Sequence, residues 1–237
     1  MSDGDALFAT ILARPDEDVP RLAYADWLDE FGDERDRARA ELIRIQIEIA
    51  SIPEALRTSA EVRFLELRTR ELALLATHMD DWLAPLRGPG APLQSGEAHA
   101  QFRRGFVEIV WLPAGMFVQR AGALFARGPV RELRVTRGVI GEVTELVGGS
   151  HFPRLHALDL SDRRLGDDVA RVLARRTNAA LRVLRLSGCG LTDAGAALLA
   201  RGPWELTELD VRHNDIGPAG LRALRDRFGE SAVRAGQ

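Results

Sequence analysis

The hexapeptide LHALDL at residues 155–160 decides the fold, because its leucines stand at the first, fourth and sixth positions and that spacing returns three more times. The other copies are VRELRV at 130–135, LRVLRL at 181–186 and LTELDV at 206–211. Their starting residues lie 25, 26 and 25 positions apart. A fixed period of this length is typical of a repeat protein in which each unit is one small supersecondary element.

Each copy predicts a short β-strand followed by a turn. Side chains in a strand alternate between its two faces, so the leucines point to one face and the residues between them to the other. Cys189 and Asn214 occupy the turn position at which a side chain can satisfy buried backbone groups. Arg163 and Gly138 hold that position in the other two units, and we expect those turns to be less regular.

Helices are expected after these turns, over residues 167–175, 192–201 and 217–228. Thr192 provides a capping hydroxyl and Pro218 an early-turn proline. This order of elements resembles the long, ribonuclease-inhibitor-like form of the leucine-rich repeat. The resemblance implies an α/β fold in which stacked units form a short solenoid, with parallel strands on the concave side and helices on the convex side.

The composition is that of a globular chain of one or two domains, with 237 residues, 46% hydrophobic and 28% charged, and a net charge of −3. No apolar run reaches the ~18 residues of a membrane span. The acidic N-terminus lacks the basic start and cleavage site of a signal peptide. A single cysteine excludes an internal disulfide framework. We therefore expect a cytoplasmic protein that does not bind a membrane.

Residues 1–86 predict an all-α helical bundle, because short connections favour antiparallel neighbours. Tyr24, Trp27, Leu28 and Phe31 lie at helical spacing, which places Trp27 in the core. The expected helices are one that ends near Pro15, one that begins after the cap Asp18 and stops at Gly32, one over 35–52 and one over 60–82.

Three segments carry a second resemblance. They are ILARPDEDVPRLAYADWLDEFGD at 11–33, RAELIRIQ at 39–46 and FRRGFVE at 102–108. Together they resemble the repeat-companion domain, a bacterial module found at the N-terminus of leucine-rich-repeat proteins. The resemblance implies a bacterial source and a companion to the repeats, and it implies no catalytic activity.

Residues 87–101 are rich in Gly, Pro, Ser and Ala and predict a linker loop. The leucine-rich-repeat domain then covers 102–237, and its first unit, 106–129, is a degenerate repeat that caps the solenoid. No polar cap follows Phe228, and the tail ESAVRAGQ is expected to fray. That uncapped C-terminal repeat could support self-association.

Catalytic and metal-binding motifs are missing from the sequence. All 32 basic residues are arginine, which excludes a phosphate-loop or Schiff-base lysine. The five histidines form no ligand spacing, so we expect no metal and no cofactor. Asp26 and Asp29 are expected on a solvated edge. An enzyme would require a cleft near Glu97, His99 and Arg103, which no spacing demands.

The concave face is the candidate site. Its middle row, Arg134, Asp159, Arg185 and Asp210, alternates in sign at intervals of about 5 Å. Such a row either forms salt bridges along itself or recognises a partner, and the sequence leaves both open. The alternating acids argue against nucleic acid. The outward positions, read from the alternation, are Glu132, Arg134, Thr136, Ala157, Asp159, Ser161, Val183, Arg185, Ser187, Glu208, Asp210 and Arg212.

Three functions are compatible with these features. The first is a non-catalytic protein–protein interaction module that uses the concave face. The second is a regulator of a nucleotide-hydrolysing partner, since helix-bearing long repeats resemble those of GTPase-activating proteins of this architecture. The third is an enzyme in its own right. The sequence favours the first.

Overall fold

The computed structural model describes residues 2–53, 61–86 and 99–236. The chain divides into two compact units, and most of the predicted linker lies outside the described residues. Unit 1 comprises Met1–Gln94, Gln101–Glu108 and Leu124–Pro129, and unit 2 comprises Ser95–Ala100, Ile109–Ala123 and Val130–Gln237. None of the helices in the described part is long and apolar enough to cross a membrane.

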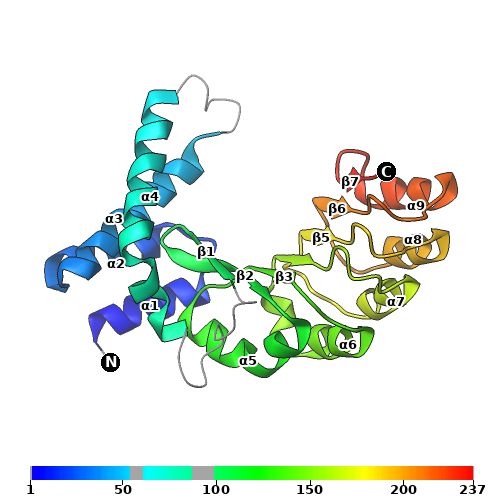
Figure 1. The fold of residues 1–237 in the computed structure, drawn as a ribbon, viewed down its shortest axis with the longest axis horizontal. Helices are drawn as coiled ribbons and strands as arrows, with labels where there is room; N and C mark the ends of the chain where they lie inside the picture. Colours follow the sequence, from blue (N-terminus) through cyan, green and yellow to red (C-terminus); the bar gives the residue numbers. More distant parts are fainter. Residues whose placement is uncertain (1, 54–60, 87–98, 237) are drawn as a thin grey trace. The chain divides into compact units, whose positions relative to one another are not determined.

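Four helices form the N-terminal part of unit 1 and pack in sequence order, each against the next (Figure 1). Ser2 and Asp33 each accept a hydrogen bond from the third residue of the helix that follows, which closes a capping box. Gly32 ends the second helix, as predicted. The bounds are α1 Asp3–Ala13, α2 Val19–Phe31, α3 Glu34–Ser51 and α4 Glu61–Leu83, with the short 3₁₀ turn η2 at Ala84–Leu86.

The predicted cap at Asp18 is wrong. Its backbone is helical, at φ −86° and ψ −27°, and its side chain makes no capping hydrogen bond. A carboxylate oxygen of Asp18 instead accepts from the guanidinium of Arg104 at 3.3 Å. A long-range partner therefore holds the side chain that sequence reasoning assigned to a local cap.

The core of unit 1 contains Ile11, Leu28 and Ile43, together with Phe106 from the later hairpin. Trp27 is partly buried against this core, in agreement with its prediction. Asp26 and Asp29 lie on the exposed face and share the guanidinium of Arg44, each at 2.7 Å.

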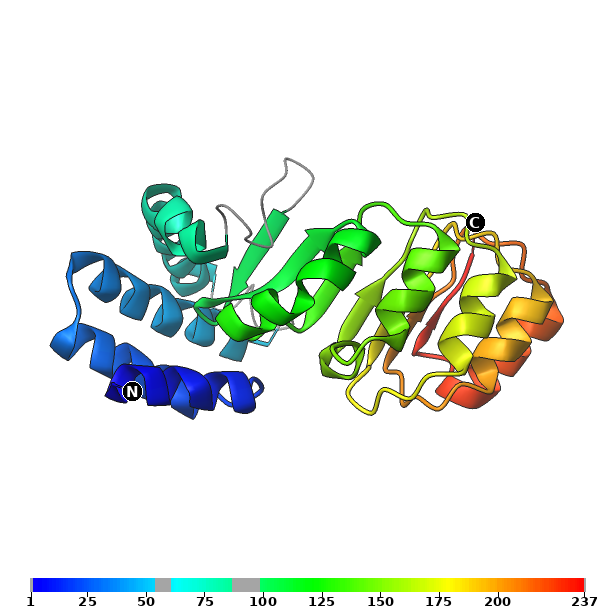
Figure 2. The same cartoon turned by 90° about the horizontal axis from the view of Figure 1, so that it is seen from below.

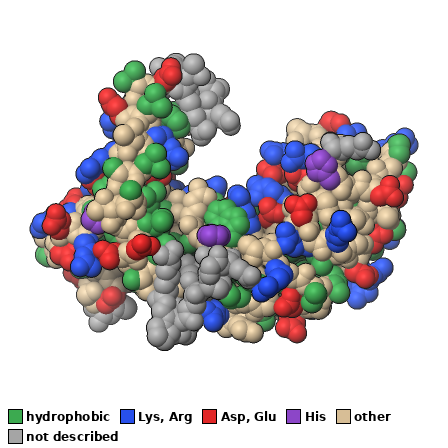
Figure 3. Space-filling view, in the orientation of Figure 1, with side chains coloured by type: hydrophobic (Ala, Val, Ile, Leu, Met, Phe, Trp, Pro, Cys, Tyr) green, Lys and Arg blue, Asp and Glu red, His purple; other side chains and the backbone are tan. Residues whose placement is uncertain are grey.

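Helix α4 is apolar on two faces. Leu67 and Leu74 are buried against the bundle, whereas Val62, Leu65 and Leu72 are more than half exposed. The space-filling view shows apolar side chains along this helix (Figure 3). Packing within unit 1 thus uses one of the two stripes.

The hairpin turn at Arg104 and Gly105 is tied to helix α3. Both turn residues have positive φ, 48° and 82°, which is the geometry of a two-residue β-hairpin. A Cβ on Gly105 would lie 2.1 Å from a side-chain carbon of Ile43, so only glycine fits. The amide side chain of Gln46 accepts from the Gly105 N–H at 2.7 Å and donates to the carbonyl of Phe102 at 3.2 Å.

The strands follow one another in a single sheet in the order β1 to β7. Every pair from β2 to β7 is parallel. Leu133, Leu158, Leu184 and Leu209 stand in register and are fully buried, which confirms the repeat alignment. The bounds are β1 His99–Arg103, β2 Phe106–Leu112, β3 Glu132–Val135, β4 Ala157–Asp159, β5 Val183–Arg185, β6 Glu208–Asp210 and β7 Val233–Arg234.

Helices alternate with the strands of unit 2 and lie together on one side of them (Figures 1 and 2). The three predicted repeat helices are confirmed to within one residue at each end, and the hydroxyl of Thr192 accepts from the Ala194 N–H at 3.2 Å. The bounds are α5 Ala114–Arg127, α6 Ile140–Gly148, α7 Asp167–Ala174, α8 Asp193–Ala200 and α9 Pro218–Phe228, with the 3₁₀ turn η3 at Phe152–Arg154.

The turn residues satisfy the backbone as predicted. The thiol of Cys189 donates to the carbonyl of Leu160 at 3.1 Å. The amide nitrogen of Asn214 donates to the carbonyl of Leu186 at 2.8 Å. Arg163 has the same function, because its guanidinium donates to the carbonyls of Ser161 and of Thr136. A longer donor thus replaces the usual Cys or Asn.

The C-terminal tail does not fray, contrary to the prediction. Residues 233–234 form β7, which pairs with β6 and buries Val233 to 7% exposure. The N–H groups of Leu209 and Val211 donate to the carbonyls of Ala232 and Arg234 at 2.8 and 2.9 Å. A short strand therefore covers the edge that the last predicted repeat would leave open.

Deleting residues 230–237 should lower the free energy of unfolding by about 2 kcal/mol, through the loss of Val233 burial and of the β6 ladder. The newly open edge should also make the truncated protein aggregate as its concentration rises. Urea denaturation and light scattering would measure both effects. Unchanged stability would show that β7 contributes nothing, and Arg234→Gln, which keeps the strand, is the control.

Candidate protein-binding site

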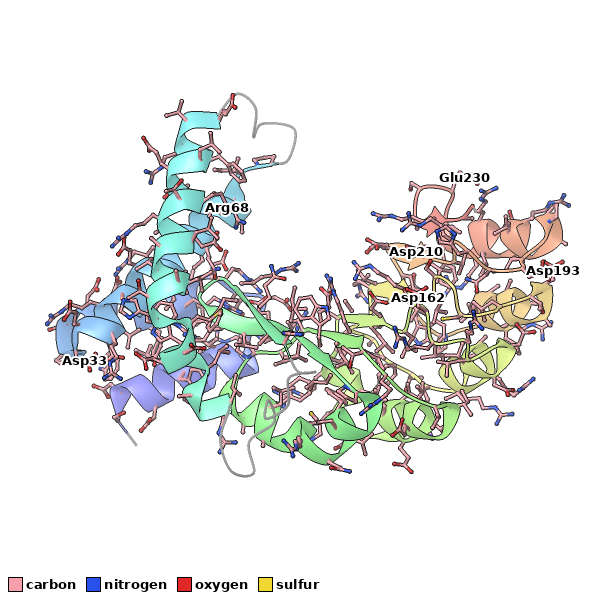
Figure 4. All side chains as sticks on the ribbon, in the orientation of Figure 1. Asp33, Arg68, Asp162, Asp193, Asp210 and Glu230 are labelled. Atoms are coloured by element: carbon pink, nitrogen blue, oxygen red, sulfur yellow. The ribbon has the colours of Figure 1, made fainter. Side chains whose placement is uncertain are left out.

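The strand face is the set of side chains on β2 to β7 that point away from the helices. The predicted middle row is in register, with Arg134 beside Asp159, Asp159 beside Arg185 and Arg185 beside Asp210. Trp111 extends the row at one end and Arg234 at the other. Figure 4 shows Asp210 on this side of the strands.

Two glutamates outside the middle row form its main ion pairs. Arg185 contacts Glu132 at 3.0 Å and Glu208 at 2.9 Å, so its guanidinium bridges strands on both sides. Arg134 contacts Glu132 at 2.6 Å, and Arg234 contacts Glu208 at 3.4 Å. One of the two expectations was that salt bridges form along the row itself. The arginines of the row instead form diagonal salt bridges with Glu132 and Glu208.

The acids and the arginines lie at different depths. The side chains of Glu132 and Asp210 are only 7% and 5% exposed, whereas those of Arg212 and Arg234 are 48% and 57% exposed. Arg134 is intermediate, and its guanidinium carbon lies 4.8 Å from the centre of the Trp111 ring. The carboxylates of Glu132 and Asp210 therefore form a lower layer under the more exposed guanidinium groups of Arg212 and Arg234.

Neighbouring charges keep Arg185 and Asp210 ionised. Burial lowers the pKa of Arg185, but the carboxylates of Glu208 and Glu132 outweigh burial and hold that pKa above its ordinary value. Burial raises the pKa of Asp210, but hydrogen bonds from Arg212 lower this pKa by more than burial raises it. The net pKa of Asp210 therefore lies below the usual range. Both groups remain charged at neutral pH.

The other predicted positions shape the face. A carboxylate oxygen of Asp159 accepts from the Ser161 N–H at 2.9 Å, which fixes the end of β4. Ala157 is buried, whereas Val183 and Ser187 are partly exposed. Thr136 is partly exposed, and its buried hydroxyl has no hydrogen-bond partner among the described residues.

No group of three or more His, Cys, Asp or Glu residues that could hold a metal is present in the described ranges. Burial raises the pKa of the Cys189 thiol to about 11, so that thiol is not a nucleophile at neutral pH. His99 and Arg103 lie on β1, whereas Glu97 lies outside the described residues.

Two comparisons bear on the repeats. Residues 177–200 and 206–224 match the Leucine Rich repeat family. These residues contain β5, α8 and β6 and most of α9, with their buried leucines in register. Unit 2 has the fold of a leucine-rich-repeat solenoid.

A ribonuclease inhibitor of Sus scrofa is 41% identical to the chain over 89 residues, which are 35% of this chain and 20% of that relative. The chain thus spans about a fifth of the length of this curated relative. The similarity supports the repeat architecture of the leucine-rich-repeat solenoid.

Sequence reasoning missed the two ends of the charged row. Trp111 belongs to a strand that lacks the leucine hexapeptide, and Arg234 belongs to a tail without any leucine. The apolar spacing of Phe106, Ile109 and Trp111 predicts the buried positions of a repeat strand, and this register is wrong, because Val110 pairs with Leu133 and Trp111 pairs with Arg134. No signal in the tail marks β7.

Proposed function

We propose that this chain is a non-catalytic interaction module whose leucine-rich-repeat solenoid holds a protein partner on its strand face. The observation that carries the proposal is the layered charge of that face, with guanidinium groups held above nearly buried carboxylates. Long parallel rows of fixed side chains are the binding surface that repeat proteins commonly use. The ribonuclease inhibitor relative is named for an action on another protein, which fits this proposal.

The depth of the charges indicates the chemistry of the partner. Guanidinium groups that project above carboxylates offer hydrogen-bond donors in a fixed geometry, and such donors prefer carboxylates. Arg134 and Arg234 stand near the two ends of the row. The partner should therefore present acidic side chains to the strand face.

Arg134→Gln combined with Arg234→Gln tests this proposal. Arg185 still neutralises Glu132 and Glu208 in this variant, so the fold should not change. Capture of a partner from cell lysate should fall about tenfold or more if these side chains are binding hot spots. The matched control is Arg171→Gln with Arg222→Gln, two exposed arginines on helices α7 and α9.

A partner captured equally by the wild type, the strand-face variant and the control would contradict binding through this face. Charge reversal at Arg185 is a poor test, because a third carboxylate beside Glu132 and Glu208 would destabilise unit 2. Circular dichroism of each variant should match that of the wild type before capture is compared.

A further inference from the structure

Unit 1 contains a pocket of about 340 Å³ that the strand face does not involve. Phe8, Tyr24, Trp82 and Phe106 contribute aromatic rings to its wall, and Arg39 contributes a guanidinium. These side chains come from α1, α2, α3, α4 and β2. The volume lies at the lower end of the ~300–1,000 Å³ range of small-molecule pockets.

Arg39 contacts three aromatic rings, and none of the described acids forms an ion pair with it. Its guanidinium carbon lies 4.8 Å from the centre of the Phe102 ring, 5.1 Å from that of Trp82 and 5.2 Å from that of Phe106. Among the described residues it has no ion pair and no hydrogen bond, and its Nε atom is buried without a partner. Arg21, which is fully buried in the same unit, is instead paired with Glu108 at 2.7 Å.

Burial also affects the charge of this guanidinium. Burial lowers the pKa of Arg39 to about 9, although nearby Tyr24 and Asp36 act in the opposite direction. The group therefore stays charged at neutral pH, while its N–H donors lack the anion that usually accompanies a desolvated guanidinium. The aromatic faces supply part of the missing negative potential and leave the in-plane donors unused.

The hydroxyl of Tyr24 is a second unused donor. Tyr24 lines the same pocket, and its hydroxyl has no hydrogen-bond partner among the described residues. Burial raises the pKa of Tyr24, so the hydroxyl keeps its proton at neutral pH. Arg39 and Tyr24 together offer two donor groups within an otherwise apolar wall.

Two acids on the pocket limit the charge that it can accept. Asp36 accepts from the N–H of Asp33 at 3.2 Å, at the start of α3 where Figure 4 labels Asp33. Asp81 forms a long ion pair of 3.8 Å with Arg35. Both carboxylates line the pocket together with Arg39 and Arg127, so the lining carries as many acids as arginines, and a monoanion suits it better than a phosphate dianion.

We propose that this pocket binds a small monocarboxylate with an apolar body, whose carboxylate pairs with Arg39 and accepts from the Tyr24 hydroxyl. The apolar body lies against Phe8, Trp82 and Phe106. Either a free organic acid or the C-terminal carboxylate of a peptide carries this chemistry. The site is independent of the strand face and of its proposed partner.

Isothermal titration calorimetry of the full chain tests the proposal with 4-phenylbutyrate and with its neutral analogue 4-phenylbutanol. The acid should bind saturably, and the alcohol should bind about 10- to 100-fold more weakly, because it lacks the charged hydrogen bond. Arg39→Gln should weaken the binding of 4-phenylbutyrate by the same factor. Arg44→Gln changes an exposed arginine on the same helix and should leave the affinity unchanged.

A peptide that ends in phenylalanine, with a free or an amidated C-terminus, distinguishes the two sources. Tighter binding of the free peptide than of 4-phenylbutyrate would assign the site to a protein C-terminus, and the reverse order would assign it to a small acid. If Arg39→Gln does not fold, Tyr24→Phe replaces it in the experiment, and the affinity for 4-phenylbutyrate should fall about fivefold. Equal binding of acid and alcohol, or no binding of any probe at millimolar concentration, overturns the proposal.

Discussion

Glu108→Ala should lower the free energy of unfolding by about 3–5 kcal/mol, because it leaves a buried arginine without its carboxylate. The Arg21 side chain is fully buried, and one of its terminal nitrogens lies 2.7 Å from a carboxylate oxygen of Glu108. Arg104 contacts the same oxygen at 2.9 Å. Urea denaturation followed by circular dichroism would measure the loss.

Burial opposes ionisation of both partners. It raises the pKa of Glu108 and lowers the pKa of Arg21 to about 10, and the charge of each partner opposes the shift of the other. Arg21 also donates to the carbonyls of Pro15 at 2.8 Å and of Arg104 at 3.1 Å, so it cannot swing out to solvent once Glu108 is gone. The unpaired buried charge of Arg21 therefore raises the free energy of the folded state.

Arg44→Ala is the matched control for this prediction. It breaks two ion pairs at 2.7 Å, with Asp26 and Asp29, but all three side chains are well exposed. The expected loss is below ~1 kcal/mol. If Glu108→Ala lowered the free energy of unfolding as little as Arg44→Ala does, the buried pair would stabilise the fold no more than an exposed one.

A double variant separates charge from packing. Arg21→Met combined with Glu108→Leu removes both charges. The free energy of unfolding should fall less in this double variant than the sum of its decreases in the two single variants. Arg104 also donates to the carbonyl of Pro15 at 2.9 Å, so we expect that carbonyl to keep a donor in the double variant. Strict additivity would mean that the two side chains act separately.

The repeats were predictable from the sequence, since an apolar position every 25 or 26 residues forces leucines such as Leu158 and Leu184 into one buried column. The row Arg134, Asp159 and Arg185 followed from the same register. Its ion pairs did not follow, because an arginine side chain is long enough to reach diagonally to Glu132 rather than to its neighbour in the row.

The elements that the sequence did not indicate depend on backbone contacts or on residues far apart in the chain. Strand β7 pairs through N–H and carbonyl groups, which any residue supplies, so ESAVRAGQ carries no apolar signal. Arg21 and Glu108 are separated by most of the bundle in sequence. Arg39 stands at helical spacing from Leu42 and Gln46, and only the fold brings it against Phe102 and Phe106.

Leu184→Ala should lower the free energy of unfolding by about 2–5 kcal/mol. Leu184 is fully buried and stands between Leu158 and Leu209 in register. Alanine loses the burial of the side chain and leaves a cavity. Parallel strands hold the neighbouring backbones about 4.8 Å apart, so the column cannot close over that cavity without breaking its ladder.

Leu72→Ala is the comparison, because the same substitution at a side chain that is 59% exposed on α4 should cost less than ~0.5 kcal/mol. Calorimetry would measure both variants. A repeat array couples each unit to its neighbours, so loss of Leu184 should weaken the interfaces on both sides of β5 and lower the midpoint of the whole solenoid. A Leu184 variant that melts with the wild type would place that leucine outside the column, and the repeat alignment on which the strand face depends would then be wrong.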